Sequence, residues 1–459
     1  MKKFKQTLLV GACSAMLGGV SLPAQSANWL MLQGTEPSDA APRAKFWGFI
    51  QAGYKEDNSD PSVAGEYIPP KLVGPDLTSQ SGFNITRARI GARGQGFPLD
   101  GNVNYFFLAE FGNNAITYPG DSFAKITDAS ITLNHIPGAR VRLGLFKTPG
   151  SEEIYQGIAL FDYIEFTNYT NQQLLERIPN ADYVNGFSGD VAPQPIDTAG
   201  ALNAFDSSVA AARDTGVQVF DTFKVGDWEH SYAVMYGNGN GLNQGDNDDN
   251  KDTYLYWSSE KIFAGKGPRV QSLKVFAWSQ DGKRLLDNTN NGVYDPQEYD
   301  RKRSGIGFKY LRKPWRFSGE YSKAEGMIWL GPHTPSFDMY PAPGDGGHGE
   351  NGKASGYYFD VGYYVPHTNW ELDARYDVYK RLEDDQVATA GPLAGLGSFE
   401  TEWTTLTLGV QYHFNLKTRL TVNHIMRDVE AVDFASGVGP NAQLDGIGDR
   451  TAIQVTHIF

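Results

Sequence analysis

The stretch FNITRARIGARG, from Phe83 to Gly94, alternates arginines with small or apolar residues. Because side chains alternate across a β-strand, this period of two predicts a strand with two unlike faces. A face that carries several arginines needs water or an anion opposite it. We place Ala88, Ile90 and Ala92 on one face, and on the other Ile85, Arg87, Arg89, Gly91 and Arg93.

The neighbouring stretches continue the alternation. Ala44 to Lys55 predicts a first strand. In the stretch from Asn102 to Phe111, the outer face holds Val103, Tyr105, Phe107, Ala109 and Phe111, and the inner face holds Asn102, Asn104 and Glu110. From Lys125 to Ile136, the outer set is Thr127, Ala129, Ile131 and Leu133, and the inner set is Asp128, Ser130 and Asn134. Ala139 to Thr148 sets Val141, Leu143 and Leu145 against Arg140 and Arg142.

Eleven more candidate strands follow in the second part of the chain. They lie near 214–225, 227–237, 252–263, 269–280, 302–312, 314–325, 354–365, 368–380, 402–414, 416–428 and 449–459. With the five before them the total is about sixteen, an even number, as in bacterial single-chain membrane barrels. Tight turns such as Val225-Gly226-Asp227 alternate with long polar loops such as 237–252, which is typical of an up-and-down barrel. The fold class expected is therefore an all-β, transmembrane antiparallel barrel.

The ends of the chain and its composition indicate a protein that is exported from the cytoplasm. Residues 1–27 read as a signal peptide, with lysines, an apolar run and small residues at its end. The lead-in is then 28–43 and the barrel 44–459. The formal charge is −13, or −16 without the three lysines of the signal, so nucleic-acid binding is not expected. Cleavage after Ala27 would remove Cys13, the single cysteine, and with it thiolate chemistry and disulfides.

One long passage, 149–213, interrupts the strands. It opens PGSEEIYQGIALFDYIEFTNYTNQQLLERIP and carries aromatic residues together with acids. It is too long for a tight turn, and we expect it to fold into the lumen as a constriction. Its five acids of interest are Glu152, Glu153, Asp162, Glu165 and Glu176.

The chain stops at DRTAIQVTHIF, with Ile453, Val455 and Phe459 on one face and Gln454 and Thr456 on the other. A terminal Phe that closes an alternating strand resembles the assembly signal of outer-membrane barrels. The alternative is an ordinary amphipathic edge strand.

These pieces together resemble the phosphate-selective porin O/P family of Gram-negative outer membranes. The resemblance rests on RARIGARG at Arg87 to Gly94, VRLGLFKTP at Val141 to Pro149, the Glu176-Arg177 pair and RDTGVQV at Arg213 to Val219, and it continues more weakly through LDARYDVY at 372–379 and LTLGVQYHF at 406–414. It implies a sixteen-stranded homotrimeric porin with a loop folded into the pore. Family members differ in solute, and the acids of the long passage depart from the anion-selective pattern.

A porin selects by pore width and by the charges that line its narrow part. The expected pore-lining, anion-binding residues are Arg87, Arg89, Arg93, Arg140, Arg142, Lys147, Arg177 and Arg213. An arginine fork matches phosphate or a carboxylate with two parallel hydrogen bonds. The alternative is that these cations pair with the acids of the long passage and fix it to the wall. Both roles remain open from the sequence.

A separate motif, DNTNNGVYDPQE, follows the spacing of the twelve-residue calcium loop. Its candidate ligands for a Ca²⁺ ion are Asp287, Thr289, Asn291, the Val293 carbonyl, Asp295 and Glu298, with Gly292 at the turn. Thr289 and Pro296 depart from the usual pattern, and polar Asn/Asp/Gly loops also arise by chance. Such an ion would stabilise an external loop, and no cofactor is required.

The function expected is passive diffusion of small hydrophilic solutes through an outer-membrane channel, with a lean towards anions such as phosphate. Outer-membrane lipid and lipopolysaccharide would surround it. The alternatives are a surface receptor or adhesin on a plugged barrel, and an exported soluble β-protein. No protease, hydrolase or P-loop motif occurs, so an enzyme is not expected.

Overall fold

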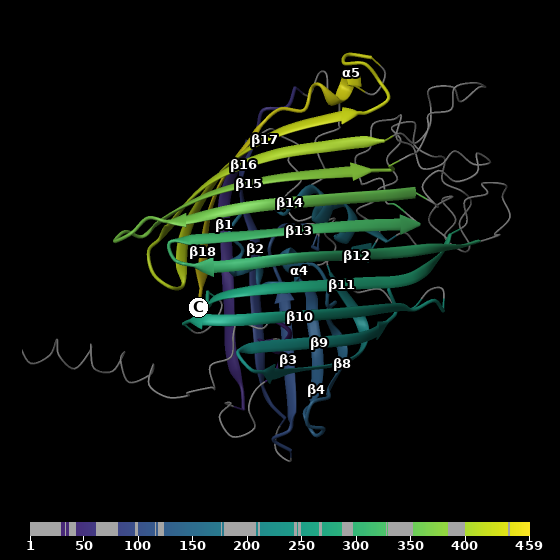
Figure 1. Cartoon of the computed structure of the whole chain (residues 1–459), viewed down its shortest axis with the longest axis vertical. Coiled ribbons are helices and arrows are strands. Elements are labelled where there is room, and N and C mark those ends of the chain that lie inside the picture. The colour runs from purple at the N-terminus through teal and green to yellow at the C-terminus, as the bar shows by residue number, and fades with distance from the viewer. Residues whose placement is uncertain are drawn as a thin grey trace, which may run out of the picture.

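The chain forms one closed barrel of sixteen antiparallel strands, as the alternation predicts (Figure 1). This computed structural model describes residues 29–32, 34–35, 43–60, 81–96, 100–114, 116–117, 124–175, 177–178, 208–209, 212–242, 246, 249–265, 269–286, 297–326, 328, 352–383, 400–438 and 441–459. The predicted signal peptide lies outside these residues. None of the described helices is long and apolar enough to cross a membrane.

Five strands precede the long passage and eleven follow it. The first group is β1 Lys45–Asp57, β2 Ser81–Gln95, β3 Val103–Glu110, β4 Lys125–Leu133 and β5 Arg140–Lys147. The second group is β8 Arg213–Val225, β9 Trp228–Gly237, β10 Asp252–Ala264, β11 Gln271–Leu286, β12 Gln297–Arg312, β13 Trp315–Gly326, β14 Gly352–Tyr364, β15 Trp370–Arg381, β16 Thr401–His413, β17 Thr418–Ala431 and β18 Arg450–Ile458. Two short helices, α2 Trp29–Leu32 and α5 Asn441–Leu444, lie near the chain ends.

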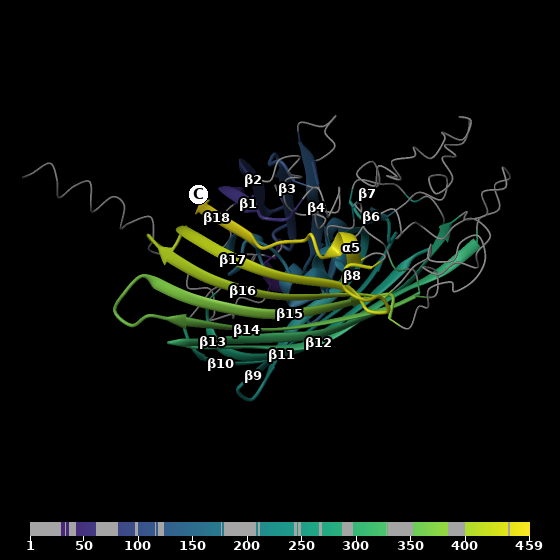
Figure 2. The same ribbon diagram turned by 90° about the horizontal axis from the view of Figure 1, so that it is seen from above.

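Closure comes from β1, which pairs with β2 on one side and β18 on the other. Figure 2 shows the curved wall of β9 to β17 opposite β1 to β4. The hairpin turns at one end are short, as between Val225 and Trp228 or Arg312 and Trp315. The connections at the other end are longer, which confirms the predicted alternation.

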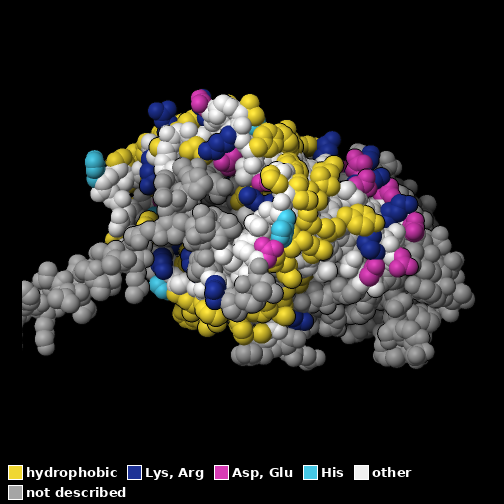
Figure 3. All heavy atoms as spheres, turned by 90° about the horizontal axis from the view of Figure 1, so that it is seen from below, with side chains coloured by type: hydrophobic (Ala, Val, Ile, Leu, Met, Phe, Trp, Pro, Cys, Tyr) yellow, Lys and Arg dark blue, Asp and Glu magenta, His cyan; other side chains and the backbone are white. Residues whose placement is uncertain are grey.

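The two faces of the wall differ as expected. Large apolar side chains such as Leu255, Trp257 and Ile306 are exposed on the outside, and Figure 3 shows hydrophobic side chains gathered in a band across the middle of the face seen from below. Polar side chains such as Asn104 and Gln411 are buried on the inside. The last strand follows the same rule, because Ile453 and Val455 face outward and Gln454 and Thr456 inward.

Two β-bulges correct the predicted faces. Gln51 pairs with Arg87 and Ala52 with Ile85, so Thr86 is an extra residue in β2. The bulge turns Ile85 outward, where it is 53% exposed, instead of leaving it with the arginines. In β4 the register likewise skips Thr127, whose hydroxyl turns inward and donates to the Leu108 carbonyl at 3.2 Å.

Strands β11 and β12 are longer than the sequence predicts. Their ladder continues through Lys283 and Arg284, which pair with Asp300 and Tyr299. The expected ends were at 280 and 302, where the apolar alternation stops. Backbone hydrogen bonds continue beyond the apolar band because a hairpin ladder needs no buried face to extend.

Candidate functional site

The first part of the long passage, residues 149–175, lies against the inner face of the barrel. It contains α4 Glu152–Tyr155, a 3₁₀ turn Ile158–Leu160 and a π-helical turn Thr170–Leu174. Gln51 on β1 donates to the Ile158 carbonyl at 3.3 Å, and the Ile164 amide donates to Asn423 on β17 at 2.8 Å. Because both partners point inward, this segment, here called the inner loop, occupies the lumen.

The inner loop enters beside a buried carboxylate on β13. Glu320 accepts hydrogen bonds from the Ser151 hydroxyl at 2.9 Å, the Glu152 amide at 3.2 Å and the Trp278 indole at 2.7 Å. Lys147, at the end of β5, donates to the carbonyl oxygens of Ile154 and Gln156, both at 2.8 Å. The backbone groups that α4 leaves unpaired at its ends are therefore bonded to the wall.

The acids of the inner loop form ion pairs with cations of the wall. The pairs are Glu152 with Lys274 at 2.6 Å, Glu153 with Arg375 at 3.2 Å, Asp162 with Arg269 at 2.9 Å, and Glu165 with Lys55 at 2.7 Å and Arg450 at 2.9 Å. These four acids thus tether the inner loop to the barrel, which agrees with one half of the tethering alternative. Their partners, however, are not the cations singled out from the sequence.

Asp162 joins the largest of these networks. Arg316 on β13 lies 3.2 Å from Asp162 and 2.6 Å from Asp373, and it also bonds Asp360. Arg419 on β17 donates to the Phe161 carbonyl, next to Asp162. The Asp162 carboxylate is therefore held by Arg316 of β13 and by Arg269, which lies in the turn before β11.

The charges around the loop acids decide their ionisation. Burial raises the pKa of the Glu165 carboxyl, but Arg450 and Lys55 lower it by more, so its pKa lies below the ordinary value. Asp162 behaves in the same way, with Arg316 and Arg269 opposing burial, and its pKa is also lowered. Both carboxylates are therefore ionised at neutral pH.

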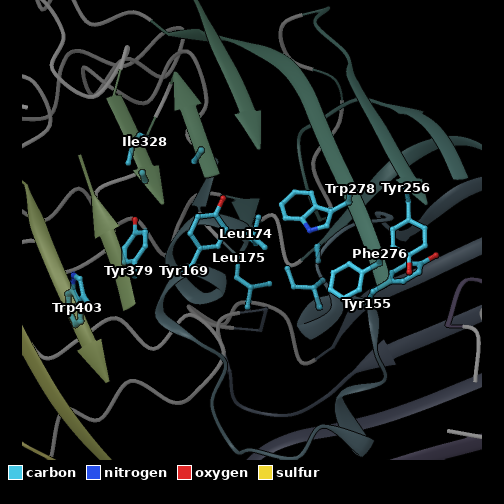
Figure 4. Close-up of a cluster of buried hydrophobic side chains, with 14 of the residues drawn as sticks. Tyr155, Tyr169, Leu174, Leu175, Tyr256, Phe276, Trp278, Ile328, Tyr379 and Trp403 are labelled. Carbon is cyan, nitrogen blue, oxygen red and sulfur yellow. The ribbon is translucent and has the colours of Figure 1, made fainter. Parts of the chain in front are cut away.

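Aromatic contacts add an apolar anchor to the inner loop (Figure 4). Tyr155 of α4 lies beside Tyr256, with ring centroids 5.4 Å apart, and close to Phe276 in the same buried cluster. Tyr169 meets Tyr379 edge to face at 5.9 Å. Such pairs contribute about 0.5–1.5 kcal/mol each beyond the area they bury.

The cations predicted to line the pore lie on the wall formed by β2, β5 and β8. Three of them pair with acids of the wall, since Arg89 meets Glu110 at 2.6 Å, Arg213 meets Asp128 at 3.3 Å and Arg140 meets Asp221 at 3.2 Å. Three others donate to neutral oxygens, because Arg87 bonds Gln51, Arg142 bonds the Leu30 carbonyl, and Lys147 bonds the loop backbone.

Two predicted residues stand apart. Arg93 is only half-buried, near the short-turn end of β2. Arg177 begins β6 Arg177–Ile178, which pairs with β7 Ser208–Val209 in a separate two-stranded sheet. Its side chain lies outside the described residues, as does Glu176.

The cations that hold the loop could have been found from the same alternation. Apart from Arg269, which lies in the turn before β11, they sit on inward positions of β1, β11, β13, β15, β17 and β18, and the resembling stretch LDARYDVY already contained Arg375. The alternation along a strand predicts which cations point into the barrel. It does not tell which acid across the barrel meets it.

The calcium motif falls mostly outside the described residues, which leave out 287–296 and with them Asp287, Thr289, Asn291, Val293 and Asp295. Glu298 is described: it is the second residue of β12 and pairs with Lys283 at 3.2 Å on the surface. Within the described ranges no group of three acids, histidines or cysteines is placed to hold a metal ion.

No protein-family model matches the sequence, and no curated protein matches it either. Solved structures do match. The anion-selective porin from Comamonas acidovorans is 14% identical, with 91% of this chain and 99% of that chain covered and a TM-score of 0.50. The outer membrane channel DcaP of Acinetobacter baumannii is 13% identical, with coverages of 93% and 100% and a TM-score of 0.50. The fold is that of a porin.

Proposed function

We propose that the protein is an outer-membrane channel for passive diffusion of small hydrophilic solutes, with a preference for anions such as phosphate. The observation that carries the proposal is a closed barrel, apolar outside and polar inside, with a loop held in its lumen by four acidic residues. Such a loop narrows a barrel that would otherwise be wide. We expect the inner loop to form the constriction.

The outer surface supports placement in a membrane. Aromatic side chains gather at the short-turn ends of the strands, where Trp315 stacks on Phe317 and Trp370 meets Tyr412. Aromatic girdles at this height are typical of barrels in outer membranes. Together with the predicted signal peptide, they favour a location among outer-membrane lipid and lipopolysaccharide, where we expect a homotrimer.

The lean towards anions rests on the balance of charge inside. The ion pairs compensate the charges of the inner-loop acids, so these acids contribute little net negative charge to the lumen through which a solute passes. Among the cations predicted to line the pore, Arg87 donates to the Gln51 side chain, Lys147 donates to carbonyl oxygens of the inner loop, and Arg93 keeps part of its surface open. Cations that line a pore favour anions. The matching Comamonas protein, described as an anion-selective porin, agrees with this direction.

Reversal potentials in a salt gradient test the anionic preference. Changing Arg87 and Arg93 to Gln should lower the chloride-to-potassium permeability ratio by about sevenfold for each charge removed, because a unit charge about 7 Å away in water favours the anion and disfavours the cation by a factor of about 2.7 each. Arg312→Gln, an exposed arginine at the rim, is the matched control and should leave the ratio unchanged. A full chain that already prefers potassium would contradict the proposal.

A second function is favoured by one observation. Inward side chains such as Thr407, Gln411 and Asn423 are almost completely buried, as expected for a filled lumen. A barrel whose lumen is filled offers no path for a solute, and a surface receptor or adhesin needs none. A folded protein that never conducts in planar bilayers would support that function over the channel.

We also propose that the external loop 287–298 binds Ca²⁺. The spacing of its oxygen-bearing residues carries this proposal, and a bound ion would stabilise the long β11–β12 hairpin that flanks it. Calorimetric titration of the purified protein should show a heat of calcium binding that disappears in the double variant Asp287→Ala, Glu298→Ala. No heat with the unchanged chain would rule the site out.

A further inference from the structure

A short N-terminal segment lies inside the barrel. The stretch 29–35 is here called the lumenal strap, and its described residues are α2 together with Gly34 and Thr35. α2 lies against β8, and Leu30 and Met31 belong to the same buried cluster as Phe220 and Tyr155. Phe220 points inward, because its neighbour Val219 is exposed on the outer face. The strap therefore shares the lumen with the inner loop.

Gly34 fits the strap closely to the wall. Its φ of +71° lies in the left-handed region that favours glycine. A Cβ atom at this position would lie 2.8 Å from the Cβ of Phe106 on β3, closer than real Cβ contacts come. Any larger residue would have to move the strap or Phe106.

The strap covers two of the arginines that the sequence predicts to line the pore. Arg142 donates to the Leu30 carbonyl at 3.1 Å, and Arg140 donates to the Met31 sulfur at 3.3 Å. The Arg142 guanidinium stacks on the Phe220 ring at 4.3 Å, and Arg142 has no exposed surface. Its positive charge is thus shut away from the lumen by the strap and the wall together.

The strap and the inner loop are held in different ways. The inner loop is fixed by ion pairs such as Glu165 with Arg450. The strap sequence WLMLQGT contains no charged residue, so it forms none. It is held by apolar burial and by the hydrogen bonds that its Leu30 carbonyl and Met31 sulfur accept from Arg142 and Arg140. Of the two segments inside the barrel, the strap has the contacts that are easier to release.

We propose that the lumenal strap sets the charge selectivity of the channel by shielding Arg142, and with it Arg140, from the permeating solute. With the strap docked, the β5 wall presents an apolar surface and a neutral backbone. With the strap removed, the β5 wall presents two guanidinium groups, of which Arg140 remains partly balanced by Asp221. Removal of the strap should therefore raise the permeability of small inorganic and organic anions. This inference rests on the proposed channel function.

Bilayer recordings on the full-length protein and two variants test it. Deleting residues 29–35 should raise the chloride-to-potassium permeability ratio by about sevenfold, because one unit charge about 7 Å away in water favours the anion and disfavours the cation by a factor of about 2.7 each. Gly34→Val, which displaces the strap without shortening the chain, should act in the same direction. Gly138→Val is the matched control: that glycine also has a positive φ, +78°, but no atom lies within 4 Å of a Cβ there.

Adding Arg142→Gln separates the strap from a merely structural role. The substitution should change the permeability ratio little when the strap is present, and it should cancel the gain when the strap is deleted. Equal ratios in the full chain, the deletion and Gly34→Val, all conducting, would overturn the strap proposal and leave the channel intact. No conductance from any folded variant would overturn the channel, and the strap's role with it.

Discussion

At the scale of single residues, removing an inner-loop acid should reduce the stability of the folded barrel by more than removing an acid of a surface ion pair. Glu165 sits between Lys55 and Arg450 with 18% of its side chain exposed, whereas Glu298 and Lys283 are about half exposed. Removing one partner of a buried pair leaves a charge without compensation, while an exposed pair contributes little. The two sites form a natural comparison within one protein.

Glu165→Gln should therefore destabilise the folded barrel by about 3 kcal/mol, the lower end for a buried pair because Glu165 is not fully enclosed. Lys55 would be left as the uncompensated charge, since Arg450 keeps its second partner, Asp57, at 2.7 Å. The matched control Glu298→Gln should change stability by less than about 1 kcal/mol. Urea unfolding in detergent, followed by the mobility of the folded band, measures both, and equal midpoints would refute the argument.

At the scale of elements, the inner loop is a segment held by charge, so its attachment depends on pH. Asp162 and Glu165 have lowered pKa values in the folded protein, so they bind fewer protons there than when unfolded. Their contribution to stability is complete above the ordinary values of 3.8 and 4.5 and is lost as pH falls through the lowered ones. The tethers through Asp162 and Glu165 should stay in place throughout the mildly acidic range, whereas burial raises the pKa of Glu153, so its pair with Arg375 is lost first as pH falls.

Single-channel conductance should accordingly be constant between about pH 7 and pH 5, and become unsteady only below about pH 4. The double variant Asp162→Asn, Glu165→Gln should already be unsteady at pH 7, because its loop lacks these tethers at any pH. Recordings across this pH series provide the measurement. A full chain that changes conductance between pH 7 and pH 5 would show that other groups hold the loop.

The strands show how far sequence reasoning reaches at this scale. Alternation predicts each strand because burial on one side and solvent or lipid on the other act residue by residue. It misplaced Ile85 and Thr127, since a bulge adds a residue without leaving a mark in the pattern. It also could not pair Glu153 with Arg375, because the two are 222 positions apart and meet only when the barrel closes.

At the scale of the whole molecule, the barrel is a shell whose lumen holds two segments of its own chain. The inner loop runs against one part of the wall and is fixed by ion pairs with β1, β11, β15 and β18. The strap lies against β3, β5 and β8. The sequence predicts the first of these segments from its length. It does not predict the second, because seven uncharged residues before β1 read as an ordinary lead-in.

The central claim is that solutes pass through this partly filled barrel. Single-channel recording of the purified, folded full chain in planar bilayers with a salt gradient tests it most directly. The account predicts discrete conductance steps and a reversal potential displaced towards that of the anion. A protein that is folded by gel mobility yet gives no conductance, or one that conducts with a preference for the cation, would contradict it.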